Sequence, residues 1–365
     1  VDDDDGSRGV DVPVSALRAA GRLQARLCRE GGSPTWEAVV TALIDSLDDG
    51  HAASRLLRRD GRPAEGSALY LRLLGAAHRR ALSDPSCPLR QFLPTTGGAL
   101  DPDRAVGAFF AMVEENETVI AEGLAAPVQT NDVGRAAALS AAMQVIGGPL
   151  RLLEIGTSAG LNLSMDRYRV VVDENCAWGP PASPVVLTGH FESGRPPVRD
   201  WSVTTRSGCD LHPLDPTAPS DRLTLQSFVW PEHVDRMRLL AAAAAMAGPM
   251  DIAAQSGGRW LRTQLRALPS GVTTVVFHSI VVPYLGADER QEIVDAVSDA
   301  GSRADADHRL AWVTFEPSAG YAGISLSCRR FPGDTWLRLA TATPHARRIR
   351  WDPVSIPDFD WVAPD

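Results

Sequence analysis

Lysine is absent from this chain, because all 36 basic residues are arginine. A Schiff-base enzyme, a pyridoxal-phosphate enzyme and a Walker-A phosphate loop each depend on a lysine amine, so the sequence excludes these three classes. Together with abundant alanine, the same bias is typical of a protein from a GC-rich bacterial genome.

Cysteine and long apolar runs are also scarce. Five cysteines lie far apart without a CxxC pair, which argues against a disulfide framework or a structural zinc site and predicts buried thiols. No stretch approaches the roughly 18 apolar residues of a membrane span. The acidic start VDDDDGSRG is unlike a signal peptide, so we expect a cytoplasmic protein with a disordered leader at residues 1–10.

The chain has a net charge of −9, and it lacks the clustered cations that bind nucleic acid or an anionic membrane. Residues 345–350 are locally basic, and we interpret them as a solvated strand edge. We therefore expect no nucleic-acid or membrane partner. A length of 365 residues exceeds one compact core and predicts two domains.

The sequence pattern of residues 11–148 predicts an α-helical domain. We expect this domain to form a lid or an acceptor pocket for the domain that follows. Ser33-Pro34 and Asp101-Pro102 each place a capping residue and a proline at a helix start. Apolar residues then recur at helical spacing. Helical segments are predicted at 64–82, 101–120 and 132–146, the last ended by Gly147-Gly148-Pro149.

From residue 149 to 365 the pattern changes to strands that alternate with helices, which indicates a parallel sheet. Strands are predicted at 150–155, 203–206, 250–254, 272–277 and 310–315, with helices at 161–168, 231–247, 259–268 and 288–300. Segments 324–331 and 336–343 flank Pro332-Gly333-Asp334 and predict an antiparallel hairpin. The expected fold is α/β, a Rossmann-like class I methyltransferase sheet of five parallel strands plus this C-terminal hairpin. It departs from that pattern in a Pro/Gly-rich insertion at about 170–200 and in a reduced or missing helix before residue 324.

A glycine-rich turn, Glu154-Ile-Gly156-Thr-Ser158-Ala-Gly160, joins the first strand to a helix. Its spacing is not the dinucleotide fingerprint G-x-G-x-x-G, but it matches the methyltransferase pattern E-x-G-x-G-x-G with Ser158 at the middle glycine. In that interpretation the helix N-terminus faces the carboxylate of S-adenosylmethionine (SAM) and Glu154 lies near its ammonium. The alternative is a plain tight turn before a core helix.

Two further positions follow neighbouring strands and complete the predicted cofactor site. Asp210 follows the second strand, where a carboxylate accepts the ribose hydroxyls, and Gln255 follows the third and is a candidate for the adenine edge. Asp210, His212 and Asp215 match no standard metal site, so we predict no metal.

Three residues near the ends of the last parallel strands are candidates for catalysis. Histidine as a residue type can act as a base near neutral pH, and His278 is the candidate general base, with a core histidine as the alternative. Tyr284 is a candidate wall of the acceptor pocket, or a core residue. Glu316 is a candidate to orient an acceptor amine or hydroxyl, or a capping or solvated carboxylate.

A polar group in the helical region supplies candidate substrate ligands, Gln129, Asn131 and Arg135. Arg135 would clamp an anionic acceptor if this segment reaches over the cofactor. The alternative is that Asn131 or Asp132 caps the next helix while the other side chains face water.

Five ordered motifs lie between residues 129 and 279: Gln129–Arg135, Glu154–Asn162, Arg206–Asp215, Val229–Pro231 and Phe277–Ser279. Together they resemble the bacterial DUF2332 family, and this resemblance covers nearly the whole chain. This resemblance implies a methyltransferase-like Rossmann fold behind a helical N-terminal region, and it implies no particular reaction. Asn162 closes the second motif, and we group it with the cofactor ligands.

The leading functional hypothesis is a SAM-dependent methyltransferase that acts on a small-molecule acceptor. The main alternative is a non-catalytic or repurposed Rossmann protein that binds SAM or a nucleoside-like ligand. An NAD-dependent oxidoreductase is disfavoured by the glycine spacing.

Overall fold

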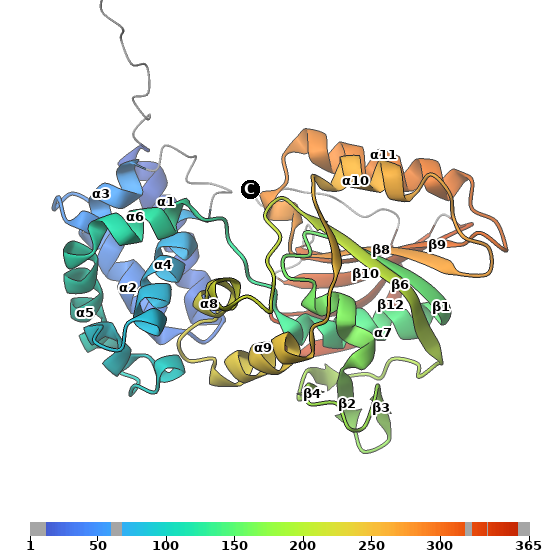
Figure 1. The fold of residues 1–365 in the computed structure, drawn as a ribbon, viewed down its shortest axis with the longest axis horizontal. Coiled ribbons are helices and arrows are strands. Elements are labelled where there is room, and N and C mark those ends of the chain that lie inside the picture. Colours follow the sequence, from blue (N-terminus) through green and yellow to red (C-terminus); the bar gives the residue numbers. More distant parts are fainter. Residues whose placement is uncertain (1–11, 60–67, 318–322, 334, 357–365) are drawn as a thin grey trace, which may run out of the picture. The chain divides into compact units, whose positions relative to one another are not determined.

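The computed structural model describes residues 12–59, 68–317, 323–333 and 335–356 (Figure 1). The predicted leader at 1–10, and most of the segment in which a helix was expected to be reduced or missing before residue 324, lie outside these ranges. The chain forms two compact units, called here the helical unit (Val1–Thr130 and Pro219–Met237) and the sheet unit (Asn131–Ala218 and Arg238–Asp365).

The helical unit is built from α-helices and two 3-10 turns around an apolar core. Its elements are α1 (Val14–Glu30), α2 (Pro34–Asp45), α3 (Ala52–Arg59), α4 (Leu69–Ser83), η1 (Pro88–Phe92), η2 (Pro94–Thr96), α5 (Pro102–Glu115), α6 (Glu117–Ala125) and α8 (Pro219–Ser227). Helix α9 (Val234–Met246) crosses from this unit into the other. Trp36, Leu43 and Phe109 are among the fully buried core residues.

The two predicted helix starts behave differently. Asp101 caps α5 by accepting the amide of Arg104 at 3.1 Å, as its sequence position predicts. Ser33 does not cap α2 with its own side chain. Its hydroxyl donates to Glu232 at 2.6 Å, and the same carboxylate accepts the Thr35 amide at 2.9 Å. A distant acid therefore supplies the cap.

The sheet unit contains a nine-stranded sheet and a small three-stranded one. The large sheet has the order β5-β12-β11-β10-β9-β8-β1-β6-β7, and the small one β3-β2-β4. The strands are β1 (Gly148–Ile155), β2 (Arg169–Asp173), β3 (Cys176–Trp178), β4 (Val186–Thr188), β5 (Phe191–Ser193), β6 (Trp201–Asp210), β7 (Asp251–Ala254), β8 (Thr273–Ser279), β9 (Leu310–Pro317), β10 (Ile324–Phe331), β11 (Trp336–Ala342) and β12 (Ile349–Ile356).

Five neighbouring strands, β7-β6-β1-β8-β9, are parallel to one another. Strands β10 and β11 form an antiparallel hairpin that continues the sheet from β9. Two strands that the sequence reading missed extend it further, because β12 pairs antiparallel with β11 and β5 pairs parallel with β12. The predicted α/β class is confirmed.

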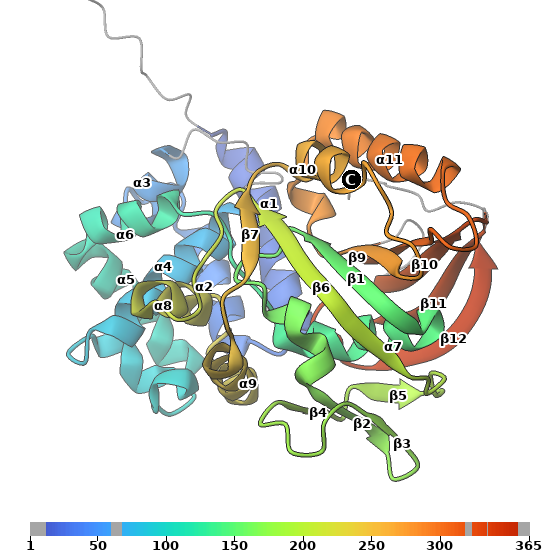
Figure 2. The same cartoon turned by 45° about the vertical axis from the view of Figure 1, so that its right-hand side comes forward.

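Helices cover both faces of the large sheet. Helices α10 (Gly257–Gln264) and α11 (Ala287–Ser302) lie together on one face, and α7 (Ala136–Ile146) lies on the other (Figures 1 and 2). Leu153, Val276 and Trp312 are buried in the core beneath α10 and α11. Because α7 contacts β6, β9 and β10, the sheet unit begins at Asn131, before the boundary of 148 that the glycine pair predicts.

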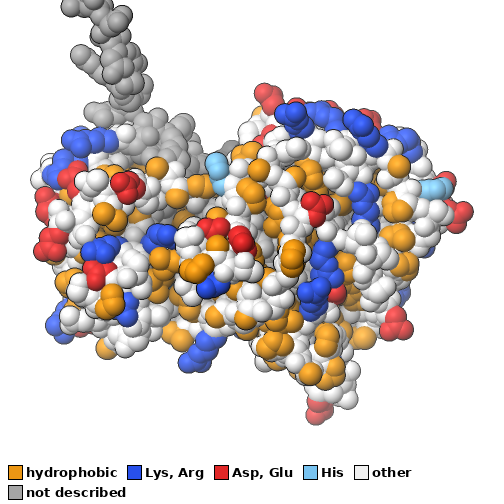
Figure 3. Space-filling model, viewed as in Figure 1, with side chains coloured by type: hydrophobic (Ala, Val, Ile, Leu, Met, Phe, Trp, Pro, Cys, Tyr) orange, Lys and Arg blue, Asp and Glu red, His pale blue; other side chains and the backbone are white. Residues whose placement is uncertain are grey.

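Some local features of the fold differ from the sequence prediction, and others confirm it. The helix predicted at 161–168 is a seven-residue 3-10 helix, η4 (Leu161–Arg167), with non-helical backbone at Ser164. Four of the strands, β2 to β5, lie in the predicted insertion. All five cysteines are free and buried, which confirms the predicted buried thiols. No helix in the described ranges is long and apolar enough to span a bilayer. Charged groups of both signs are scattered over the face drawn in Figure 3.

Candidate functional site

The candidate site lies at the carboxyl edge of the five parallel strands. Among the parallel strands, β6 and β7 lie on one side of β1, whereas β8 and β9, which follow them in the chain, lie on its other side. Such a reversal of strand order, between β1 and β8, is where open α/β sheets bind their ligands. The residues predicted to bind cofactor or act on substrate in the sheet unit follow the strands at this edge, or lie at their last residues.

Residues with a left-handed backbone conformation cluster at the same edge of the sheet. Among the described residues, five non-glycine residues have positive φ, and four of them lie in loops that leave this edge: Ser158 (53°), Ile280 (52°), Ala346 (50°) and Arg348 (53°). The turn between β11 and β12 belongs to this edge because β11, like β9, runs antiparallel to β10. Such conformations cost free energy and cluster where a function needs them.

The loop that follows β1, residues 156–160 and called here the glycine loop, is held in place by contacts with other parts of the protein. A Cβ on Gly156 (φ +66°) would lie 2.5 Å from a methyl carbon of Val281. The Ser158 amide donates to Asp210 at 2.9 Å, and the Leu161 amide donates to Asn131 at 3.1 Å. The amide at the start of η4, predicted to face a ligand carboxylate, is therefore bound by a side chain in this structure.

We expect Gly156→Ala to destabilise the sheet unit by about 2 kcal/mol more than Gly271→Ala. Both glycines have positive φ, +66° and +73°, but nothing lies within 4 Å of a Cβ on Gly271, whereas Val281 blocks one on Gly156. Urea unfolding of both variants measures the difference. Equal losses would show that backbone conformation alone, without the Val281 contact, requires the glycine.

Glu154 is a buried acid at the end of β1. Its side chain is 2% exposed, and Oε2 accepts the hydroxyl of Thr157 at 2.5 Å. The pKa of Glu154 is raised to about 8, mainly by burial and in part by the negative charge of Asp210, while the hydrogen bond from Thr157 and the charge of Arg135 act in the opposite direction. Without a bound cation, this residue is therefore mostly a neutral acid at pH 7.

Asn162 follows the glycine loop and is 1% exposed. Its Oδ1 is enclosed and has no hydrogen-bond partner among the described residues. A buried carbonyl without a donor is uncommon in folded proteins and needs an explanation, such as a bound ligand group or a water molecule.

Asp210 and Gln255 lie next to each other, because the Gln255 amide donates to the Asp210 carbonyl at 3.1 Å. Both carboxylate oxygens of Asp210 accept backbone amides, one from Ser158 and the other from His212 at 2.9 and 2.8 Å. Each oxygen keeps a second lone pair. Asp210 thus ties the glycine loop to the end of β6 and still has acceptor capacity for a ligand hydroxyl.

His278 and Glu316 form a fully buried pair at the ends of β8 and β9. His278 Nδ1 lies 2.7 Å from Glu316 Oε1, and its Nε2 accepts the Trp312 indole N–H at 3.2 Å. A general base needs an available ring nitrogen. Because both nitrogens are engaged here, the geometry favours a role in positioning for His278 over the predicted role as base.

Glu316 also holds the loop that follows β8. Its carboxylate accepts the amides of Val281 at 3.0 Å and Val282 at 3.4 Å. This carboxylate, predicted to orient an acceptor, is 0% exposed and bound by protein donors. The loop runs into η5 (Val282–Tyr284), and Tyr284 is 45% exposed. Of the three predicted catalytic residues, Tyr284 is thus the one that reaches the surface.

The predicted substrate ligands are divided between the two units. Gln129 is buried in the helical unit, and Asn131 and Arg135 belong to the sheet unit. Arg135, in η3 (Val133–Arg135), donates to the carbonyls of Ser279 at 2.9 Å and Pro344 at 3.2 Å. Arg135 therefore fastens the start of α7 to the carboxyl edge, and an anion clamp would need these bonds to rearrange.

Sequence reasoning missed His345, which it treated as part of a solvated basic edge. Its Nδ1 lies 2.8 Å from Oδ2 of Asp132, whose other oxygen accepts the Gly134 amide at 3.0 Å. Asp132 is almost completely buried, and 18% of the His345 side chain is exposed. The two residues are 213 positions apart, so no local spacing signals this pair.

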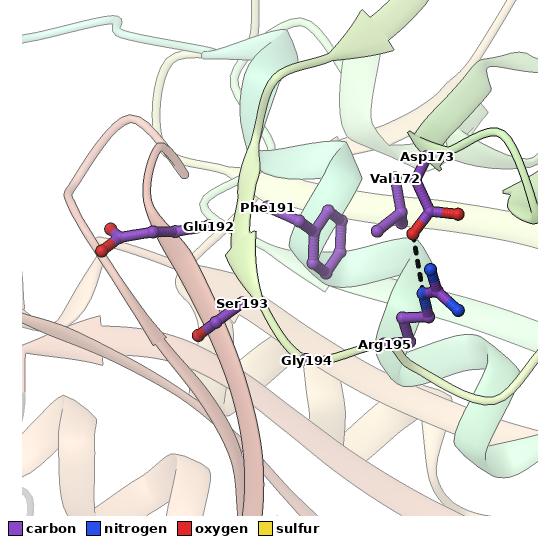
Figure 4. A pocket seen from close by; sticks show the side chains of 7 residues that line it. All are labelled: Val172, Asp173, Phe191, Glu192, Ser193, Gly194 and Arg195. Atoms are coloured by element: carbon purple, nitrogen blue, oxygen red, sulfur yellow. Dashed lines mark hydrogen bonds and ion pairs between the residues drawn. The ribbon is translucent and has the colours of Figure 1, made fainter.

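A separate cavity of about 520 Å³ lies in the insertion, away from these residues (Figure 4). It is lined by Val172, Asp173, Phe191, Glu192, Ser193, Gly194 and Arg195. Arg195 and Asp173 form an ion pair at 2.7 Å across one side of it. None of the predicted site residues lines this cavity.

Fold and site together define an α/β protein with a candidate ligand site where the order of its parallel strands reverses. Residues 18–351 match the family described as "Uncharacterized protein conserved in bacteria (DUF2332)". The chain belongs to this family. A search among curated proteins finds no match.

Proposed function

We propose that the sheet unit binds SAM at the glycine loop and transfers its methyl group to a small-molecule acceptor. The observation that carries this proposal is Glu154, a buried acid at the end of β1, beside the strand reversal and a loop with left-handed backbone at residues 156, 158 and 160. The parallel-strand order β7-β6-β1-β8-β9 and the carboxylate of Asp210 support it.

The chemistry would make small demands on side chains. SAM supplies an activated methyl group, and the protein has to align it with an acceptor and exclude water. In this proposal Asp210 accepts ribose hydroxyls, Gln255 faces the adenine and the carbonyl of Asn162 accepts a ligand donor. Tyr284 forms a wall of the acceptor pocket, and the His278–Glu316 pair fixes the loop that carries it.

A second candidate is a protein of this fold that binds SAM or another nucleoside without catalysis. It is favoured by the engagement of both nitrogens of His278 and by the protein's own oxygens on the Ser158 and Leu161 amides. Transfer of labelled methyl from SAM to a bacterial metabolite extract separates the two candidates. Product formed by the wild type favours the enzyme, and binding without product favours the second candidate.

Binding is tested by calorimetry with SAM, S-adenosylhomocysteine and NAD. We expect the first two to bind and Asp210→Ala to weaken that binding at least tenfold. Asp215→Ala is the matched control, because Asp215 accepts the Thr217 amide at 2.8 Å just as Asp210 accepts that of His212. Binding of NAD in place of the adenosyl ligands, or equal effects of the two substitutions, would contradict the proposed site.

A further inference from the structure

Glu154 has an unused oxygen. Within the described ranges its one side-chain hydrogen bond is the one from Thr157 to Oε2, so Oε1 accepts none. A buried carboxyl group is normally satisfied by several donors. Here the second oxygen is left for a group that the protein does not supply.

The groups around Glu154 do not supply a close counter-charge either. Asp210 and Cys209 come from β6, Tyr168 follows η4, and Arg135 belongs to η3. Of these, Arg135 is the cation, and it donates to the Ser279 and Pro344 carbonyls.

Apart from Arg167, which is exposed at the end of η4, the remaining charged groups on η4, β6 and β8 are already paired. On β8, the neighbouring strand, His278 is bound to Glu316. On η4 and β6, Asp166 and Arg206 bind each other at 2.8 and 2.9 Å. No ion pair between Glu154 and any described residue competes with a ligand for this carboxyl group.

We propose that Glu154 exchanges its proton for the ammonium group of the ligand, so that binding releases one proton and selects ammonium-bearing ligands over neutral analogues. This inference rests on the proposed function, since it concerns the same site. A cation beside a buried carboxyl stabilises the ionised form, and the neutral acid offers it no charge. The raised pKa of Glu154, about 8, means that the proton is present at pH 7 and has to leave.

The test compares two nucleosides by calorimetry at pH 7 in buffers of different ionisation enthalpy. S-adenosylhomocysteine carries the ammonium, and 5′-methylthioadenosine is the same thioether nucleoside without the amino acid. We expect release of about one proton with the first and almost none with the second. The association constant of S-adenosylhomocysteine should rise about tenfold per pH unit from pH 6 towards 8 and then level off.

Glu154→Gln, which retains the shape and an acceptor for Thr157, should abolish the proton release and the pH dependence. Glu192→Gln, an exposed acid of the same unit, should keep both. Binding of S-adenosylhomocysteine without proton release, or release that Glu154→Gln retains, would overturn the exchange and leave the adenosyl site standing. Failure of the wild type to bind S-adenosylhomocysteine between pH 6 and 9 would overturn both proposals.

Discussion

Glu316→Ala is expected to lower the free energy of unfolding of the sheet unit by about 3–5 kcal/mol. The Glu316 carboxylate is fully buried and accepts three donors, the ring of His278 and the amides of Val281 and Val282. Alanine leaves all three buried without a partner. Since Val281 packs against Gly156, the glycine loop should also lose its support, and affinity for an adenosyl ligand should fall.

Urea unfolding followed by tryptophan fluorescence measures the loss. Thr314→Val is the control, because Thr314 lies on the same strand, is equally buried and has a hydroxyl without a partner among the described residues. Its removal should be close to neutral. Glu316→Gln retains one acceptor oxygen and should fall between the two. A loss for Glu316→Ala as small as that for Thr314→Val would mean that the three donors find other partners.

The fold was predictable where the signal is local. Strands β1, β8 and β9 are short buried apolar runs, and Gly333 marks the turn between β10 and β11. Pairing between strands far apart in the sequence was not predictable, because the residue pattern of a strand does not specify which strand it pairs with. Strand β5 pairs with β12 from more than 150 residues away, and residues 219–237 return to the helical unit although they lie between two strands of the sheet.

The candidate site was predictable in outline for one physical reason, since the carboxyl ends of parallel strands share an edge. Thus Glu154, Asp210 and Gln255 were assigned to this edge from sequence. Their partners could not be assigned. Asn131 binds an amide 30 residues away and His345 lies 213 residues from Asp132, so the bonds that decide whether a side chain is available depend on the completed fold.

The second large effect is a gain in stability. Glu154→Gln should unfold less readily than the wild type at neutral and alkaline pH, by about 3 kcal/mol at pH 7 and about 4–5 kcal/mol above pH 8. The pKa of Glu154 is raised from its ordinary value of 4.5 to about 8 by burial. Between these values the folded state holds a proton that the unfolded state has lost, so wild-type stability falls as pH rises through this window. Glutamine has no such proton.

The measurement is the difference in unfolding free energy between the two proteins from pH 4 to 9. The difference should be near zero at pH 4 and grow with pH. His78 also affects stability in this pH range, because burial lowers its pKa from 6.5 to about 4. Protonation of His78 therefore destabilises the helical unit as pH falls from 6.5 towards 4, in both proteins, and it cancels in the difference. A difference that stays flat with pH would show that Glu154 is ionised throughout.

Such a gain bears on function, because Glu154 then lowers the stability of the fold at neutral pH. A residue that costs stability is explained by a role other than folding, such as ligand binding. The glutamine variant retains the hydrogen bond to Thr157 and the packing around β1, and it lacks the negative charge that an ammonium ligand requires. Higher stability combined with weaker binding of S-adenosylhomocysteine would identify Glu154 as a ligand-binding acid. Higher stability with unchanged binding would assign it to the architecture of the glycine loop alone.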